Sequence, residues 1–336
     1  MRLVTFSAWG TQSVGALLSD DRIVDLTALT KTDPQGRWFQ SMQDMIEAGP
    51  EALRLAEEIV GDPPRSAIVP SAEAHLLAPL PRPVRMRDCN LFTEHVERFY
   101  ERKHQLEAEA AAGSEQAAAQ LAVAKRLRFD LLLKRLTYYT VDPLSVSGHD
   151  EDIHWPAYSK IADFELEWAV VIGNRGKDIP LEAAADHIFG YTIFNDWSAR
   201  DEQLVHMEMG IGPAGGKDFD GAKTLGPCIA TPDEFRNLSD VRMIARVNGE
   251  EWTNRSSRNM RFTFEQAIVE MSRSRTIYPG DIFASGTVLG GSAVDHGRSL
   301  KDGDVVELEV EGIGMLRNRV RMSDGQSDRS RRPERG

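Results

Sequence analysis

Short runs of apolar residues, many of them β-branched or aromatic, recur along most of the chain and are separated by Gly, Pro and Asp. Runs of this length and composition are typical of β-strands. They occupy residues 2–6, 15–18, 23–26, 169–172, 188–194, 243–247, 281–285 and 305–310. Residues 42–59 instead indicate a helix, which ends before the breaker Gly-Asp-Pro-Pro at 61–64. We therefore expect an α+β protein in which sheet dominates.

The same pattern divides the chain into segments. Residues 1–75 are expected to form a small N-terminal α+β domain. The three prolines of LLAPLPRPVRMR (76–87) mark a connector, and a large domain is expected over 76–320. Within it, residues 96–136 are rich in Ala, Glu, Gln, Lys and Leu, which favours a helical insertion. Residues 321–336 have no apolar periodicity and are expected to be a disordered tail.

Composition narrows the classes of function. The chain has 52 acidic and 40 basic residues, a net charge of −12 and a pI near 5.2, which disfavour a nucleic-acid partner. The sequence contains no apolar run long enough to cross a bilayer, and its first residues alternate where a secretory signal would be continuously apolar. Cys89 and Cys228 are far apart and are expected to be free thiols. We expect a cytoplasmic protein with no membrane role.

Two glutamates stand at the start of an apolar strand pattern. In DFELEWAVVIG (163–173), Glu165 and Glu167 are two residues apart, so alternation places both on one face, about 7 Å apart at the backbone. Carboxylates this close repel each other unless a cation, a proton or basic groups lie between them. Ligation of a hard cation is one interpretation, and a solvated face with Asp163 on the opposite side is the other.

A second polar group follows a buried strand pattern. FGYTIF (189–194) runs directly into NDWSARD (195–201), so acid, aromatic and basic side chains gather at one strand end. Such an end is a common place for a functional site on a rigid scaffold. Alternatively, Asp196 caps a helix and pairs with Arg200 one turn later. The pattern leaves both interpretations open.

The third polar group is RDCNLFTEH (87–95), in which Asp88 precedes His95 by seven residues. A histidine is suited to accept a proton near neutral pH, although His95 could equally be a surface residue of a helix. The segment also permits a Cys89–His95 nucleophile pair. We disfavour that pair because Asp88 would raise the pKa of the adjacent thiol.

These three groups, in this order, resemble the pattern of the fumarylacetoacetate hydrolase family. The resemblance spans residues 76–320 and implies that the large domain is a mixed, strongly curved β-sheet roll, with the N-terminal segment similar to the family's small domain. It also includes the motifs WPAYS (155–159), GKDF (216–219), LGP (225–227), VNGE (247–250), PGD (279–281), SGT (285–287) and EGIG (311–314).

The resemblance also implies roles for individual residues. His95 would be the general base, and Lys217 would stabilise an enolate. An all-oxygen carboxylate site selects Mg²⁺, with Mn²⁺ or Ca²⁺ as alternatives, over metals that recruit His or Cys. The expected metal ligands are Asp88, Glu165, Glu167 and Asp196, and the expected substrate contacts are Tyr139, Arg200, Gln203 and Thr287.

The implied function is metal-dependent hydrolysis of a C–C bond in a small β-diketo or 2-oxo acid, of acylpyruvate or fumarylacetoacetate type, by a homodimer. A lyase or isomerase of the same fold is the alternative: a decarboxylase, hydratase or tautomerase also passes through an enolate. A non-catalytic binding protein is a third interpretation. A degenerate scaffold, however, has no physical need to keep several carboxylates together.

The sequence departs from the family pattern at three places. The residue three positions after His95, often a glutamate that orients water, is Arg98. Glu97 and Glu101 are the nearby substitutes. Cys89 and Asn90 stand where close relatives usually have aromatic residues, and Met207 stands where fumarylacetoacetase would have a substrate-binding tyrosine. We therefore expect altered substrate specificity.

Overall fold

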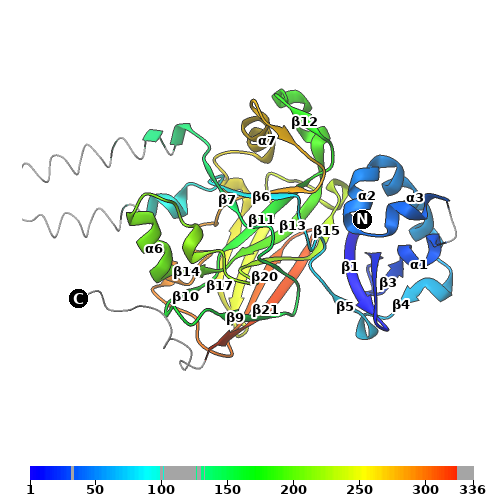
Figure 1. Ribbon diagram of the computed structural model, residues 1–336, viewed down its shortest axis with the longest axis horizontal. Coiled ribbons are helices and arrows are strands. Elements are labelled where there is room, and N and C mark those ends of the chain that lie inside the picture. The colour runs from blue at the N-terminus through cyan, green and yellow to red at the C-terminus, as the bar shows by residue number, and fades with distance from the viewer. Residues whose placement is uncertain (32–33, 99–100, 102–125, 127–129, 132, 324–336) are drawn as a thin grey trace, which may run out of the picture.

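The computed structural model of the chain describes residues 1–323 except 32–33, 99–100, 102–125, 127–129 and 132. Two β-sheets dominate it (Figure 1). Most of the predicted helical insertion at 96–136 lies outside the described residues, as does the predicted tail from residue 324 onward. The last strand, β21 (Gly314–Met322), extends two residues into the segment assigned to that tail.

The larger sheet joins the N-terminal part of the chain to the remainder. β6 (Arg85–Cys89) pairs in parallel with β19 (Asp281–Ala284), and β8 (Val146–Ser147) pairs in parallel with β15 (Lys223–Ala230). The other described pairs of this sheet are antiparallel, so the sheet is mixed. Its order is β4 (Ile68–Val69), β3 (Ile23–Asp25), β2 (Thr11–Leu17), β1 (Arg2–Ala8), β15 (Lys223–Ala230), β13 (Ile188–Asp196), β11 (Leu166–Ile172), β19 (Asp281–Ala284), β6 (Arg85–Cys89) and β7 (Tyr138–Val141), with β5 (His75–Leu76) on β1 and β8 (Val146–Ser147) on β15.

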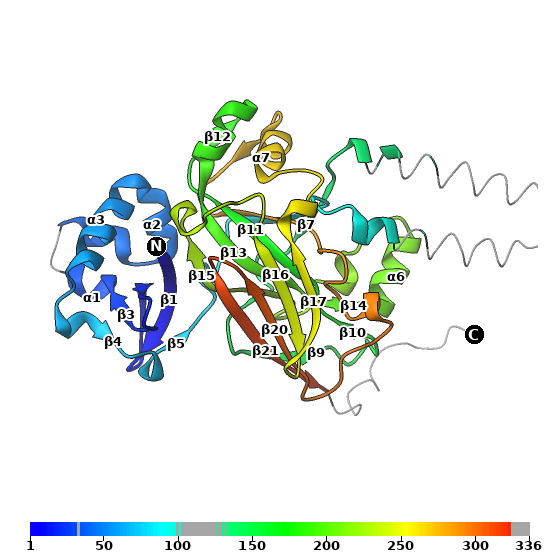
Figure 2. The ribbon, with the colours of Figure 1, turned by 180° about the vertical axis from the view of Figure 1, so that it is seen from behind.

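The central strand β11 is buried on both faces. Because side chains alternate along a strand, Trp168 and Val170 enter one hydrophobic cluster, and Ala169 and Val171 enter another. A second sheet packs on the first of these clusters (Figure 2). Its order is β17 (Glu250–Ser256), β16 (Arg242–Val247), β20 (Val305–Val310), β21 and β9 (Asp152–Trp155).

Helices and two short ribbons complete the described part of the fold. The N-terminal elements gather at one end of the molecule, at the right of Figure 1. The helices described over their whole length are α1 (Leu26–Thr30), α2 (Met42–Ala48), α3 (Pro50–Gly61), α6 (Arg200–Glu208) and α7 (Phe264–Ser272), with short 3₁₀ turns that include η5 (Ala214–Gly216) and η8 (Val294–His296). Residues 94–98 are also helical and carry His95. The ribbons pair β10 (Ala162–Asp163) with β14 (Ser198–Ala199) and β12 (Gly176–Lys177) with β18 (Thr276–Ile277).

The fold class is the mixed, sheet-dominated α+β class expected from the sequence. The single helix predicted over 42–59 is wrong in one respect: Gly49, with φ +66°, ends α2, and Pro50 begins α3. A positive φ is accessible to glycine, and proline is favoured at the first helical position. The division of the chain near residue 75 stays a prediction. Within the described residues, no helix is long and apolar enough to span a membrane.

Candidate metal and active site

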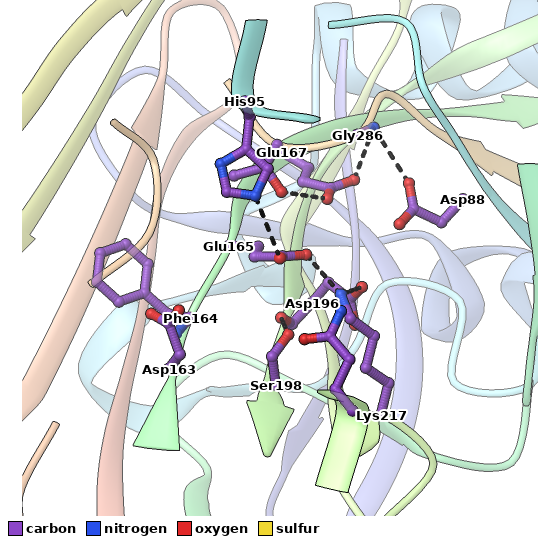
Figure 3. A network of polar contacts seen from close by, with 12 residues as sticks. Asp88, His95, Asp163, Phe164, Glu165, Glu167, Asp196, Ser198, Lys217 and Gly286 are labelled. Atoms are coloured by element: carbon purple, nitrogen blue, oxygen red, sulfur yellow. Dashed lines mark hydrogen bonds and ion pairs between the residues drawn. The ribbon is translucent and has the colours of Figure 1, made fainter. Parts of the chain in front are cut away.

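Four buried carboxylates converge from three strands of the larger sheet, β13, β11 and β6, with β19 between the last two. Glu167 lies on β11 and Glu165 directly before it, Asp196 ends β13, and Asp88 lies on β6. One oxygen from each carboxylate lies within 4.8 Å of those of the other three. Figure 3 shows the four side chains pointing toward a common centre. The sheet thus brings together acids that are more than 100 positions apart in the sequence.

A glycine turn after β19 holds two of these acids. The backbone N–H of Gly286 points to both Asp88 Oδ1, at 3.1 Å, and Glu167 Oε2, at 2.9 Å (Figure 3). Thr287 donates from its hydroxyl to Glu167 Oε1 at 3.2 Å. Gly286 has φ +76°, and a Cβ there would lie 2.3 Å from the carbonyl oxygen of Cys89. The close approach that orients the two acids therefore requires glycine.

Two buried lysines lie against the other two acids. Lys217 donates from Nζ to Glu165 Oε2 at 2.6 Å and also to Asp196 Oδ2 (Figure 3). Lys223, which is fully buried at the start of β15, donates to Asp196 Oδ1 and to the carbonyl oxygen of Lys217. The hydroxyl of Tyr139 also donates to Asp196 Oδ2. Both oxygens of Asp196 therefore have donors.

Arg200, the first residue of α6, belongs to a buried network behind the lysines. Its Nε donates to Asp163 Oδ2 at 2.7 Å and its Nη1 to Gln203 Oε1 at 2.8 Å. Its Nη2 lies 2.7 Å from Glu165 Oε1. Asp163 is fully buried and also accepts from the backbone N–H of Ala293 at 2.6 Å. The guanidinium is therefore fixed beside Glu165.

The charges in this cluster suit a divalent cation. Asp88 and Glu167 have no ion-pair partner in the described part of the chain, unlike Glu165 and Asp196. Burial, followed by repulsion from Asp196, raises the pKa of Asp88 to about 7. Burial and repulsion from Asp88 raise the pKa of Glu167 well above its ordinary value. Asp88 and Glu167 thus lack a positive charge beside them, and the cluster offers only oxygen ligands. Both features fit a hard cation such as Mg²⁺.

His95 lies between the carboxylates and a further acid, Asp295 in η8. Its Nδ1 is 3.0 Å from Asp295 Oδ2, and its Nε2 is 3.9 Å from Glu165 Oε1 (Figure 3). Burial would raise the pKa of Asp295, but hydrogen bonds from His95, Ser292 and the backbone of Gly290 lower it overall. An ionised Asp295 requires a proton on Nδ1 of a neutral His95, which leaves the Nε2 lone pair directed toward the carboxylates.

A cavity of about 280 Å³ opens beside the cluster. Asp88, His95, Glu165 and Lys217 lie in its wall. The polar part of the remaining wall is formed by Asn90, Thr137, Tyr138, Tyr139, Arg200, Gln203 and Thr287, and the less polar part by Cys89, Phe92, Val96, Met207 and Pro213, with Gly286 at the turn. A molecule in this space would contact the carboxylates, a histidine and hydroxyl and amide groups together.

Eight of the ten residues singled out from the sequence line this cavity, and Glu167 and Asp196 lie behind it, hydrogen-bonded to Thr287 and Tyr139. Their roles stay predictions. The solvated-face interpretation of Glu165 and Glu167 is wrong, because both are buried. The cap interpretation of Asp196 is also wrong, because Asp196 ends β13 and Ala199 precedes α6. Burial and nearby acids raise the pKa of Cys89 well above its ordinary value, which makes it a poor nucleophile.

The sequence reasoning missed the acid that pairs with His95. Asp295, 200 residues away, takes the position for which Glu97 and Glu101 were considered. It also missed Lys223 and the buried role of Asp163. Spacing could have revealed Asp163, which extends the alternation of Glu165 and Glu167, whereas no local signal marks the other two.

Comparisons with known proteins agree with this arrangement. The sequence pattern of the fumarylacetoacetate hydrolase C-terminal domain matches residues 108–321. Oxaloacetate tautomerase YisK of Bacillus subtilis is 29% identical over 331 residues, covering 95% of this chain and all of that protein. The mitochondrial oxaloacetate tautomerase fahd2 of Xenopus laevis is 30% identical over 324 residues, covering 95% of this chain and 90% of that protein.

A solved structure extends the similarity to the fold. The fumarylacetoacetate hydrolase of the psychrophile Exiguobacterium antarcticum matches with a TM-score of 0.69 and 29% identity, over 96% of this chain and 100% of that one. The match includes the N-terminal part as well as the two sheets, since it covers nearly the whole chain. The chain belongs to the fumarylacetoacetate hydrolase family.

Proposed function

We propose that the chain catalyses a metal-dependent proton transfer at the carbon next to the 2-oxo group of a small 2-oxo acid, as a tautomerase or isomerase. The observation that carries this proposal is the position of His95, with Asp295 at Nδ1 and the carboxylate cluster on the side of Nε2. A general base must reach the proton it removes and must be held in the right tautomer. Asp295 would hold the tautomer through Nδ1, and the cavity wall that His95 shares with Glu165 and Lys217 would bring a substrate within reach of Nε2.

In this mechanism, Nε2 of His95 removes a proton from C3 of the substrate. The C–H electron pair becomes the C2–C3 double bond, and negative charge develops on the C2 oxygen, which then takes the proton from the His95 imidazolium to give the enol and restore neutral His95. The carboxylate of Asp295 stabilises the imidazolium that His95 becomes. The reverse sequence converts the enol into the keto acid.

Positive charge is needed where the enolate oxygen forms. A divalent cation, with Mg²⁺ the first choice and Mn²⁺ or Ca²⁺ the alternatives, would be held by Asp88, Glu165, Glu167 and Asp196 and would polarise the 2-oxo group. Burial opposes the charge on Lys217, but the attraction of Asp196 and Glu165 outweighs it and raises the pKa of the ammonium. Lys217 therefore stays charged beside the reacting oxygen.

Oxaloacetate is the first substrate to test, because the two full-length relatives described above are named oxaloacetate tautomerases. Hydrolysis of a C–C bond is the second candidate, since the His95–Asp295 pair is also suited to activating a water molecule. The two reactions differ in their products: hydrolysis gives two acids, whereas tautomerisation conserves mass. A homodimer in the cytoplasm remains our expectation for the assembly.

The experiment follows the enol absorbance of oxaloacetate with and without Mg²⁺ and identifies products by mass. Acylpyruvates and fumarylacetoacetate serve as alternative substrates. His95→Ala and Glu167→Ala should abolish turnover, whereas His154→Ala, an exposed histidine on β9, should not affect it. Magnesium-dependent exchange of C3 hydrogen for deuterium in D₂O, with the carbon skeleton of the substrate intact, supports the tautomerase. Two acid products would replace it with the hydrolase, and CO₂ would replace it with the decarboxylase.

A further inference from the structure

Asn90 places a buried amide in the cavity wall. The residue is 8% exposed and lies beside the space into which His95 and Lys217 also face. Its Oδ1 accepts a hydrogen bond from the backbone N–H of Thr137 at 2.6 Å. Its Nδ2 is buried and has no hydrogen-bond partner among the residues that the structure describes. The amide is thus satisfied on one side only.

The orientation of this amide follows from its neighbour. A backbone N–H can only donate, so the atom of Asn90 that faces Thr137 must be the oxygen. The NH₂ group is then fixed on the other side. A buried donor without an acceptor is unfavourable, and an acceptor supplied by a bound molecule would remove the penalty.

The position of Asn90 relates it to the carboxylate cluster. Asn90 follows Asp88 by two residues, and its backbone N–H donates to Thr137 O at 3.1 Å, which continues the pairing of β6 with β7. Alternation therefore puts Asp88 and Asn90 on one side of the strand, about 7 Å apart at the backbone. Asn90 therefore lies in the cavity wall one strand repeat from Asp88.

We propose that Asn90 Nδ2 donates a hydrogen bond to the end of the substrate remote from the carboxylate cluster. The substrate is then a 2-oxo acid with a second oxygen acceptor, a carboxylate or a carbonyl, beyond its reacting carbon. A 2-oxo acid with an apolar chain would leave the amide unpaired and would bind less well. This inference rests on the proposed function, and it assigns a specificity role to Asn90.

Binding to the full-length, magnesium-loaded protein tests the inference without turnover. Oxalate probes the end of the site at the cluster, and malate adds a second carboxylate. Asn90→Asp keeps the size and the acceptor for Thr137 but loses the donor, and Asn90→Leu loses both without adding charge. Calorimetry gives the malate-to-oxalate affinity ratio, and Asn90→Leu separates the loss of the donor from the repulsion that the Asp side chain adds near the second carboxylate of malate. Asn254→Asp makes the same change at an exposed site on β17.

We expect both Asn90 variants to lower the affinity ratio by about 10-fold or more, while oxalate binding to Asn90→Leu stays within about twofold of the wild type. Asn254→Asp should leave both affinities unchanged. An unchanged ratio in a folded Asn90→Asp protein would overturn the role of Asn90 and leave the proposed function intact. If oxalate fails to bind the magnesium-loaded wild type, the proposed function fails, and this inference fails with it.

Discussion

Replacing Asp295 with Asn tests the base assignment with almost no change in volume. Asp295 Oδ2 accepts from His95 Nδ1 at 3.0 Å and from the Gly290 N–H at 2.9 Å. An amide oxygen in the same place can keep both hydrogen bonds but has no charge. The substitution therefore removes mainly the attraction between the carboxylate and the imidazolium that forms during the reaction.

The size of the effect follows from this contact. A hydrogen bond to a charged group contributes about 1.5–3 kcal/mol, and two charges about 4 Å apart near a protein surface attract by about 4 kcal/mol. A loss of about 1.5–4 kcal/mol corresponds to a fall in kcat of about 10- to 1000-fold. KM should change little, because His95 becomes charged only when it accepts the substrate proton, after the substrate has bound.

The assay is steady-state turnover of oxaloacetate with saturating Mg²⁺, followed by the enol absorbance. Asp302→Asn, at an exposed turn where the carboxylate accepts from the Met322 N–H, controls for the chemical change itself and should leave kcat unaltered. A folded Asp295→Asn protein with kcat within twofold of the wild type would refute the role of Asp295 and weaken that of His95.

Three further predictions concern charge in the buried cluster. Because the pKa of Asp88 is raised to about 7, Mg²⁺ binding should release protons and tighten as pH rises from 6 to 8, and a pH-independent calorimetric affinity would contradict this. In the folded, metal-free protein the raised pKa keeps Asp88 protonated at pH values where the carboxyl of the unfolded chain, with a pKa near 4, has ionised. The contribution of this proton to stability should therefore fall as pH rises from about 4 to about 7, as measured by urea titrations. Glu167→Gln should change metal-free stability by less than about 1 kcal/mol, because the raised pKa of Glu167 favours its neutral form and glutamine is a neutral side chain of the same size. It should remove the stabilisation of about 2.7 kcal/mol expected from Mg²⁺ at 100 times its Kd. Equal thermal shifts with Mg²⁺ in both proteins would count against it. Lys223→Met leaves Asp196 Oδ1 without its buried partner and should cost about 3–5 kcal/mol, so an unchanged urea midpoint would show that Lys223 is dispensable.

Local patterns predicted the parts of the site that lie on single strands. The spacing of Glu165 and Glu167 placed both on one face, and the apolar run 188–194 correctly placed Asp196 at a strand end. Repulsion between close carboxylates correctly indicated a need for positive charge. What the spacing could not decide was which face is buried, because β11 is covered on both sides by elements distant in sequence.

Features that depend on tertiary contacts were beyond the sequence. The pairing of His95 with Asp295 depends on where η8 lies after two sheets have packed. Lys223 precedes a strand with little charge of its own, and only the pairing of β15 with β13 sets it opposite Asp196. The break at Gly49 was missed because apolar residues continue on both sides of it.

The pairing of β1 with β15 has a consequence for attempts to shorten the protein. Arg2 and Leu3 lie opposite Ala230 and Ile229, so the first residues of the chain cover the backbone groups of a strand that also carries Lys223. A chain that starts at the connector would leave this stretch of β15 open to solvent. Uncovered strand edges of apolar residues pair readily with other copies. By covering β15, the N-terminal strand β1 should limit aggregation. The solubility of a truncated chain should therefore be measured before its activity.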